Sequence, residues 1–290
     1  MWFTLALLSA AFAGLRGARE KVLLAQLDQF TIGWVFQLFS LPLLIATLLL
    51  THKTLNPLHL GAAYWLPSLM VTLLFYPINT WLFYKALSMG ELSKVLPIQS
   101  IMPALSMLMA FVVLREIPTA LASAGISLII LGLYVINLNG LKLHNPFQPF
   151  LEDRSTLYML GSTTSVALIL PLDKIAINAS NPLFYMVMST IGGTTILCLI
   201  AMIASPQGPK NVSKNLRPLL AIGTSRGLAY ATFIGALGLG PVAYVSSVRS
   251  SSALIGAVTG LVYLKEPVTW AKMTALILIG SGLSVLAFAK

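Results

Sequence analysis

Apolar runs of about twenty residues follow one another along the whole chain, and they limit its fold more than any other feature. A helix of about 20 residues crosses a hydrocarbon core of about 30 Å, so each run is long enough to span a membrane. Of the 290 residues, 57% are hydrophobic and only 9% are charged, against about 25% charged in an average globular domain. A soluble fold cannot bury that much apolar surface. The sequence therefore predicts an all-α membrane protein with many spans.

Charged, proline-rich and glycine-rich connections divide the apolar runs into ten predicted transmembrane helices. The first run resembles a secretory signal, but its basic residues follow the apolar part instead of preceding it, so we expect a retained helix. The ten helices are expected near residues 2–24, 29–50, 60–88, 92–114, 118–138, 155–177, 182–204, 217–239, 241–264 and 267–289.

The second half of the sequence repeats the first. Residues 86–133, shifted by 150, align without a gap with residues 236–283. We therefore divide the chain into a first five-helix repeat, residues 1–140, a linker, residues 141–153, and a second five-helix repeat, residues 154–290. Because five is an odd number, the second repeat is predicted to be inverted in the membrane, as is typical of secondary transporters.

The repeat includes Leu-Arg-Glu at residues 114–116, which recurs as Leu-Lys-Glu at residues 264–266. We expect a structural role for Glu116 and Glu266. A carboxylate at the start of a helix binds free amides and stabilises the helix dipole. Each acid is therefore predicted to cap the helix that follows it, while its basic neighbour closes the preceding helix.

Each half also has an acid-lysine pair near its first helix, Glu20-Lys21 and Asp173-Lys174. Two five-helix halves with this pair, and with Leu-x-Glu between the fourth and fifth helices, resemble EamA-type members of the drug/metabolite transporter superfamily. Pro103 matches the proline habitual in the family's fourth helix, whereas the second half has Ala253. The resemblance implies an exporter or exchanger of small metabolites, with a central cavity lined by all helices except the fifth and tenth.

Two arginines are expected near the middle of the membrane. Arg226 follows Arg217 by nine residues and so lies roughly 13 Å into the eighth helix, and Arg249 is similarly deep in the ninth. An arginine at that depth costs on the order of 3 kcal/mol and must face a cavity or a partner. The repeat aligns polar residues with these positions in the first half. The predicted substrate-binding residues are Arg226, Arg249, Tyr230, Gln99, Tyr76, Thr80, Asn79, Trp81, Tyr84 and Arg16.

All eight acidic residues are expected near helix ends, so the counter-charge for these arginines is predicted to come from the substrate. The leading hypothesis is a secondary transporter that moves a small anionic or zwitterionic metabolite by alternating access, in export or exchange. Amino acids, organic acids and phosphate esters fit this class. Alternatively, the arginines bind backbone carbonyls or hold the two halves together. The alternative functions are an exporter of lipophilic cationic drugs, which needs a deep carboxylate, and a non-transporting membrane-embedded enzyme or scaffold.

Other partners receive little support from the sequence. The net charge is +10, but the basic residues form no run, so nucleic-acid binding is not expected. The single cysteine, Cys198, lies in an apolar run, and the histidines have no acidic or thiol neighbours at ligand spacing. No metal, cofactor or enzymatic activity is therefore predicted. The expected partners are a small-molecule substrate and the lipid bilayer, and a monomer is favoured over a dimer.

The orientation of the termini is left open by two opposing arguments. Lys and Arg are more numerous in the connections that follow odd-numbered helices, so the positive-inside rule predicts both termini outside. The family resemblance implies both termini inside, and we prefer that orientation. In a bacterium the location would be the cytoplasmic membrane.

Overall fold

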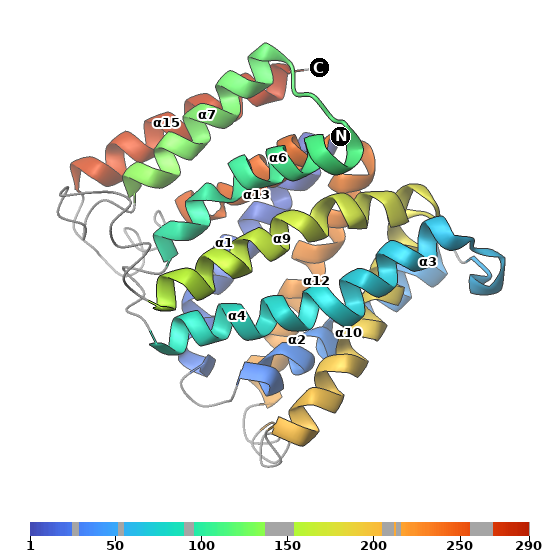
Figure 1. Cartoon of the computed structure of the whole chain (residues 1–290). Helices are drawn as coiled ribbons and strands as arrows, with labels where there is room; N and C mark the ends of the chain where they lie inside the picture. The colour runs from blue at the N-terminus through green and yellow to red at the C-terminus, as the bar shows by residue number, and fades with distance from the viewer. Residues whose placement is uncertain are drawn as a thin grey trace.

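The structure is a computed structural model that describes residues 1–24, 29–51, 55–89, 96–136, 154–204, 212, 216–255 and 269–289. Every regular element in these ranges is a helix (Figure 1). The helices of the first half are α1 (Trp2–Leu24), α2 (Gln29–Leu50), η1 (Pro57–His59), α3 (Ala62–Leu69), η2 (Met70–Phe75), α4 (Tyr76–Met89), η3 (Leu96–Ile101), α6 (Met102–Leu114) and α7 (Ala120–Ile136). Those of the second half are α9 (Arg154–Asn178), α10 (Pro182–Ala204), α12 (Leu216–Leu239), α13 (Val242–Ser250) and α15 (Trp270–Phe288).

Apart from the short η1, the described helices join into ten rods at the places where the sequence predicts ten spans. The third rod consists of α3, η2 and α4, and the fourth of η3 and α6. The prediction of an all-α fold with ten helices is thus confirmed. Five helices in the described ranges are long and apolar enough to cross a membrane: Phe30–Leu50, Ala62–Ala86, Arg154–Asn178, Pro182–Ala204 and Trp270–Phe288.

Three of the rods depart from a regular α-helix. The third contains the π-helix η2, in which the N–H of Tyr76 bonds to the carbonyl of Val71, five residues earlier. The fourth begins as a 3₁₀ helix and becomes α-helical at Met102. The next residue, Pro103, has no N–H and therefore suits a first turn. The ninth is interrupted at Ser251, whose N–H bonds to Val248 at 3.1 Å before helical residues resume.

Helices with the same place in each half pack against one another: α2 on α10, α6 on α13 and α7 on α15. Figure 1 shows α7 and α15 side by side. A Cβ atom added to Gly125 would contact Leu286, and one added to Gly132 would contact Ile279, so α7 and α15 run antiparallel. The α2–α10 pair is antiparallel too, because Gly33 lies against Leu197 while the later Gln37 lies against the earlier Gly193.

The first helix of each half also packs against the third and fourth rods of the other half. α1 contacts α12 and α13, and α9 contacts α4 and α6. The largest buried apolar cluster contains side chains of both halves, among them Ala6, Leu44, Tyr64, Tyr185 and Phe233. The two halves of the sequence therefore share one core.

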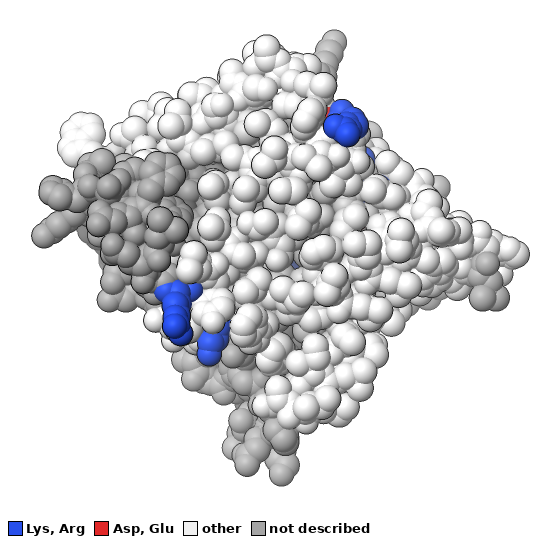
Figure 2. All heavy atoms as spheres, viewed as in Figure 1, with Lys and Arg blue, Asp and Glu red and all other residues white. Residues whose placement is uncertain are grey.

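The outer surface suits hydrocarbon. Large apolar side chains are exposed along the helices, including Leu49, Leu66, Leu73, Ile203 and Ile277. On the face drawn in Figure 2, the visible Lys and Arg side chains gather mainly near opposite edges, and the broad surface between them is almost entirely uncharged. An apolar surface this extensive is expected where lipid, not water, surrounds the helices.

Candidate functional site

The centre of the candidate site is Arg226, which lies ten residues from the start of α12 and thirteen from its end. Its Nη2 donates a hydrogen bond of 3.0 Å to the hydroxyl of Tyr76, the first residue of α4. Both side chains are half-buried. The repeat places these two residues at equivalent positions, and the structure brings them together between the two halves.

Tyr230 extends this site onto α10. It lies one turn beyond Arg226 on α12, and its hydroxyl shares a hydrogen bond of 3.0 Å with the hydroxyl of Ser189. Ser189 was not among the predicted site residues. Its only signal in the sequence is a Ser-Thr pair inside a mostly apolar run that also holds a Thr-Thr pair, and hydroxyl residues of this kind are too common in membrane helices to single it out.

Arg249 lies in the last turn of α13 and is held by two other helices. Its Nη1 donates a hydrogen bond of 3.0 Å to the hydroxyl of Ser9 on α1, and its guanidinium lies 4.3 Å from the ring centroid of Phe233 on α12. Ser9 is fully buried and donates in turn to the carbonyl of Ala229 at 2.7 Å. Ser9 is a second contact residue that the sequence did not reveal.

Asn79 and Thr80, both on α4, make different hydrogen bonds. The Asn79 side-chain oxygen accepts a hydrogen bond of 2.7 Å from Ser162 on α9. Thr80 is buried, and its hydroxyl donates to the carbonyl of Tyr76 at 2.9 Å, so its proton is used within its own helix. Asn79 therefore joins two helices, whereas Thr80 supports the turn that carries Tyr76.

The other predicted site residues lie apart from the Arg226 contact. Trp81 is 42% exposed, and its ring lies 5.5 Å from that of Tyr158, centroid to centroid. Tyr84 packs on the small apolar cluster around Phe36, and Gln99 is exposed, with its amide nitrogen 3.5 Å from the sulfur of Met159. The side chain of Arg16 lies outside the described residues.

The family model of the EamA-like transporter family matches residues 1–138 and residues 154–288, which together are nearly the whole chain. This chain belongs to the EamA-like transporter family. The family predicted from the sequence is thus confirmed, and the protein is an integral membrane protein of a transporter family.

A solved structure described only as "Crystal structure of protein" has the same fold as this EamA-like chain. The two are similar over 98% of this chain and 94% of that one, with a TM-score of 0.76 and 14% sequence identity. Comparison with curated proteins found no significant match.

One acid of this EamA-like transporter is buried. We expected every acidic residue near a helix end, and Asp173 does lie five residues from the end of α9, but its side chain is only 4% exposed. The carboxylate accepts a hydrogen bond from the hydroxyl of Tyr185 on α10. Helix tilt and packing decide whether such a residue is buried, and the position of an acid within an apolar run does not report them.

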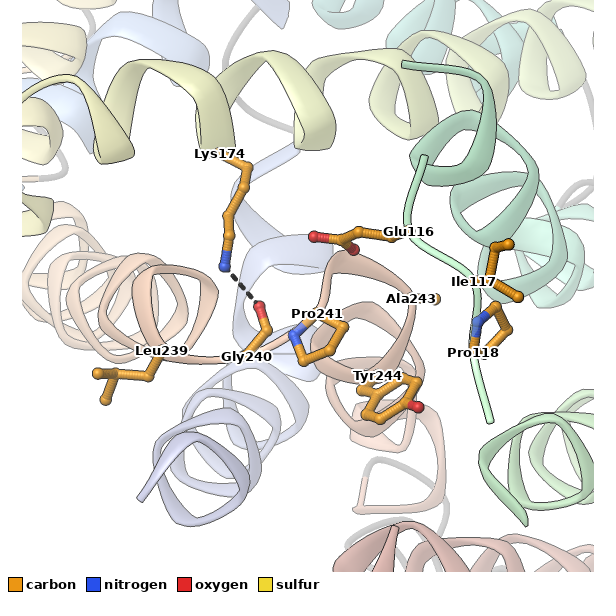
Figure 3. A pocket seen from close by; sticks show the side chains of 9 residues that line it. All are labelled: Glu116, Ile117, Pro118, Lys174, Leu239, Gly240, Pro241, Ala243 and Tyr244. Carbon is orange, nitrogen blue, oxygen red and sulfur yellow. Dashed lines mark hydrogen bonds between the residues drawn. The ribbon is translucent and has the colours of Figure 1, made fainter. Parts of the chain in front are cut away.

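The acid-lysine and Leu-x-Glu sequences meet where α12 ends and α13 begins (Figure 3). Lys174 donates to the carbonyls of Leu237 and Gly240, the latter at 2.7 Å, while the Glu116 carboxylate accepts from the N–H of Val242 at 2.8 Å. The ammonium thus lies at the carbonyl end of one helix and the carboxylate at the amide end of the next, so both stabilise helix dipoles. Lys174, Glu116 and Gly240 line a pocket of about 340 Å³.

The prediction that Glu116 caps the helix following it was wrong. Thr119 caps that helix, α7, by accepting from the N–H of Ala122 at 3.3 Å. Arg115 closes α6 as expected, in a left-handed conformation with φ 59° and ψ 25°, and the N–H of Glu116 bonds back to Ala110 at 3.3 Å. This turn directs Glu116 to α13 instead. Its repeat equivalent, Glu266, lies outside the described residues.

Metal binding has no structural support in the part of the chain described here, where no group of three or more His, Cys, Asp or Glu side chains is arranged to hold an ion. The candidate site of this EamA-like transporter is therefore the polar contact set of Arg226, Tyr76, Tyr230 and Ser189 between its two halves.

Proposed function

We propose that this EamA-like transporter moves a small anionic or zwitterionic metabolite across the membrane. The observation that carries the proposal is the Arg226 cation at mid-length of α12, hydrogen-bonded to Tyr76 of the other half. A guanidinium keeps its charge at all physiological pH values, and its five N–H groups match the oxygens of a carboxylate or phosphate. Amino acids, organic acids and phosphate esters therefore fit the site.

The proposed mechanism is alternating access by two inverted repeats. The antiparallel packing of α2 on α10 and of α7 on α15 supports it, since equivalent helices run in opposite directions when one repeat is upside down relative to the other. Two halves built alike can exchange conformations and open the central site to each side in turn. Export and exchange both use this cycle.

The alternative, an exporter of lipophilic cations, has one observation in its favour: the buried carboxyl group of Asp173. Arg226 opposes it, because a fixed positive charge at mid-length of α12 repels a cationic substrate. Arg226 therefore makes the anion transporter the better proposal.

The test is transport by the purified protein in liposomes, with a panel of radiolabelled amino acids, organic acids, phosphate esters and one lipophilic cation. We expect saturable flux of an anion or zwitterion, and we expect Arg226→Gln to raise its apparent KM at least tenfold, as for loss of a charge-assisted hydrogen bond. Arg217→Gln is the matched control, since Arg217 is exposed at the start of the same helix. Flux of the cation alone, or an unchanged KM in Arg226→Gln, would disprove the proposal.

A further inference from the structure

Asp173 is a buried acid that the proposed anion site does not use. Its side chain is 4% exposed, and its hydrogen-bond partner Tyr185 is fully buried. The neighbouring ammonium of Lys174 is directed to the carbonyls of Leu237 and Gly240. The acid therefore receives its hydrogen bond from a neutral phenol, and its ionised form is costly in such surroundings.

A series of polar side chains leads from this acid to the anion site. Tyr185 and Ser189 lie four residues apart, and hence on one face of α10. Ser189 shares its hydrogen bond with Tyr230, which lies four residues from Arg226 on one face of α12. Arg226 in turn donates to Tyr76. Charge on the acid and charge at the anion site therefore lie along one polar path through α9, α10, α12 and α4.

The other titratable and charged groups of this region are mostly neutral phenols. From the helices packed on α9 and their connections they are Tyr64 (α3), Tyr76 (α4), Glu116 (between α6 and α7), Tyr185 (α10), Arg226 and Tyr230 (α12), and Tyr244 and Arg249 (α13). The Glu116 carboxylate already accepts a hydrogen bond from the N–H of Val242, at the amide end of α13. Among the carboxyl groups that the structure describes, this leaves Asp173 as the one whose charge can change within the buried contacts around Tyr185.

We propose that Asp173 is a proton-binding site and that its protonation favours anion binding at Arg226. The inference rests on the proposed anion site. An ionised Asp173 repels a bound anion through the protein interior, whereas a protonated Asp173 does not, so proton and anion bind cooperatively. The proton binds to a carboxylate oxygen and leaves from it after the anion is released. The transporter thereby carries a proton together with its anion.

The linkage is tested by the pH dependence of anion binding to the protein in lipid nanodiscs. The probe is a carboxylate that stays ionised over the range used, lactate or the organic acid found by the liposome panel. We expect the wild type to bind it roughly tenfold more tightly at mildly acidic than at mildly alkaline pH. Asp173→Asn should bind tightly at both, and Glu116→Gln, the matched carboxyl control, should keep the wild-type pH dependence.

Proton binding itself is tested without any anion, by infrared difference spectra of the ligand-free protein on acidification. We expect a protonated-carboxyl band that Asp173→Asn lacks and that Glu116→Gln and Asp173→Glu retain. The Asp173→Glu variant keeps the proposal testable if the Asn variant does not fold.

The two proposals fail in different ways. Anion binding that depends on Arg226 but is the same at both pH values overturns the linkage and leaves the anion site standing. A band that persists in Asp173→Asn overturns the proton site. If the band titrates as expected but no anion binds, the proposed function fails, and the linkage fails with it.

Discussion

Arg226 and Tyr76 occupy equivalent positions in the two sequence repeats, and they are hydrogen-bonded to each other at 3.0 Å. In the proposed inverted arrangement, equivalent positions meet when they lie close to the axis that relates the two halves. The contact therefore combines a central position with a chemical difference, a guanidinium from one half and a phenol from the other. Because the repeat equivalent of Arg226 is a neutral tyrosine, the proposed site has one fixed positive charge at this position and not two.

Tyr76→Phe should weaken anion transport about fivefold, because the guanidinium loses the acceptor that orients it. The measurement is the apparent KM in liposomes. In the Arg226→Gln background the same change should have little further effect, since both residues act through one contact. Tyr158→Phe is the control, because that ring contacts Trp81 instead. Fully additive losses would contradict the proposed coupling.

Glu116→Ala should lower the stability of the protein by about 1 kcal/mol, because the amide end of α13 loses its charged acceptor. Thermal unfolding in detergent measures the effect. Glu116→Gln keeps an acceptor at the same place and should lose less. Equal melting temperatures for the wild type and the Ala variant would show that the bond to Val242 contributes nothing.

Gly282→Ala should separate α7 from α15 and destabilise the protein by on the order of 1 to 3 kcal/mol. The added Cβ would lie 2.7 Å from the carbonyl oxygen of Gly125, a backbone atom that cannot move aside. Gly280→Ala is the matched control on the same helix, because a Cβ there meets nothing within 4 Å. Equal melting temperatures for the two variants would show that the close approach of Gly282 to Gly125 does not contribute to stability.

Cysteines at Thr4 and Val212, introduced with Cys198 replaced by Ser, should react with an impermeant maleimide from opposite sides of the membrane. The reason is that an odd number of spans separates them when each of the ten rods crosses once. Labelling of intact cells and of inverted vesicles also decides between the two predicted orientations of the termini. Labelling of both positions from one side would contradict the arrangement of spans.

The helix ends that lie within the described residues could be predicted well, because length and apolarity decide which segments enter a bilayer. The π-turn before Tyr76 and the interruption at Ser251 could not. They arise from individual backbone hydrogen bonds, such as the one from Tyr76 to Val71, which replace the regular pattern without changing composition.

The candidate site was predictable to a smaller extent. Depth along α12 identified Arg226, and the repeat alignment identified Tyr76, but nothing in the sequence indicated that the two touch. Ser189 and Ser9 were missed because a hydroxyl within a mostly apolar run looks the same whether it faces lipid, a neighbour or the interior. The role of Glu116 was misassigned because its partner, Val242, lies on a helix distant in sequence.

The π-turn of η2 holds one more residue than an α-turn, and it does so immediately ahead of Tyr76. The π-turn could shift along the helix, from the N-terminal to the C-terminal side of Tyr76. The phenol would then rotate by about 100° around the helix axis, while both ends of the rod stayed in place. Such a rotation would release the guanidinium without displacing any neighbouring helix. Deleting Leu74 removes the extra residue of the π-turn and should give a folded protein that no longer transports. Unimpaired transport would disprove the idea that the π-turn shifts past Tyr76 during transport.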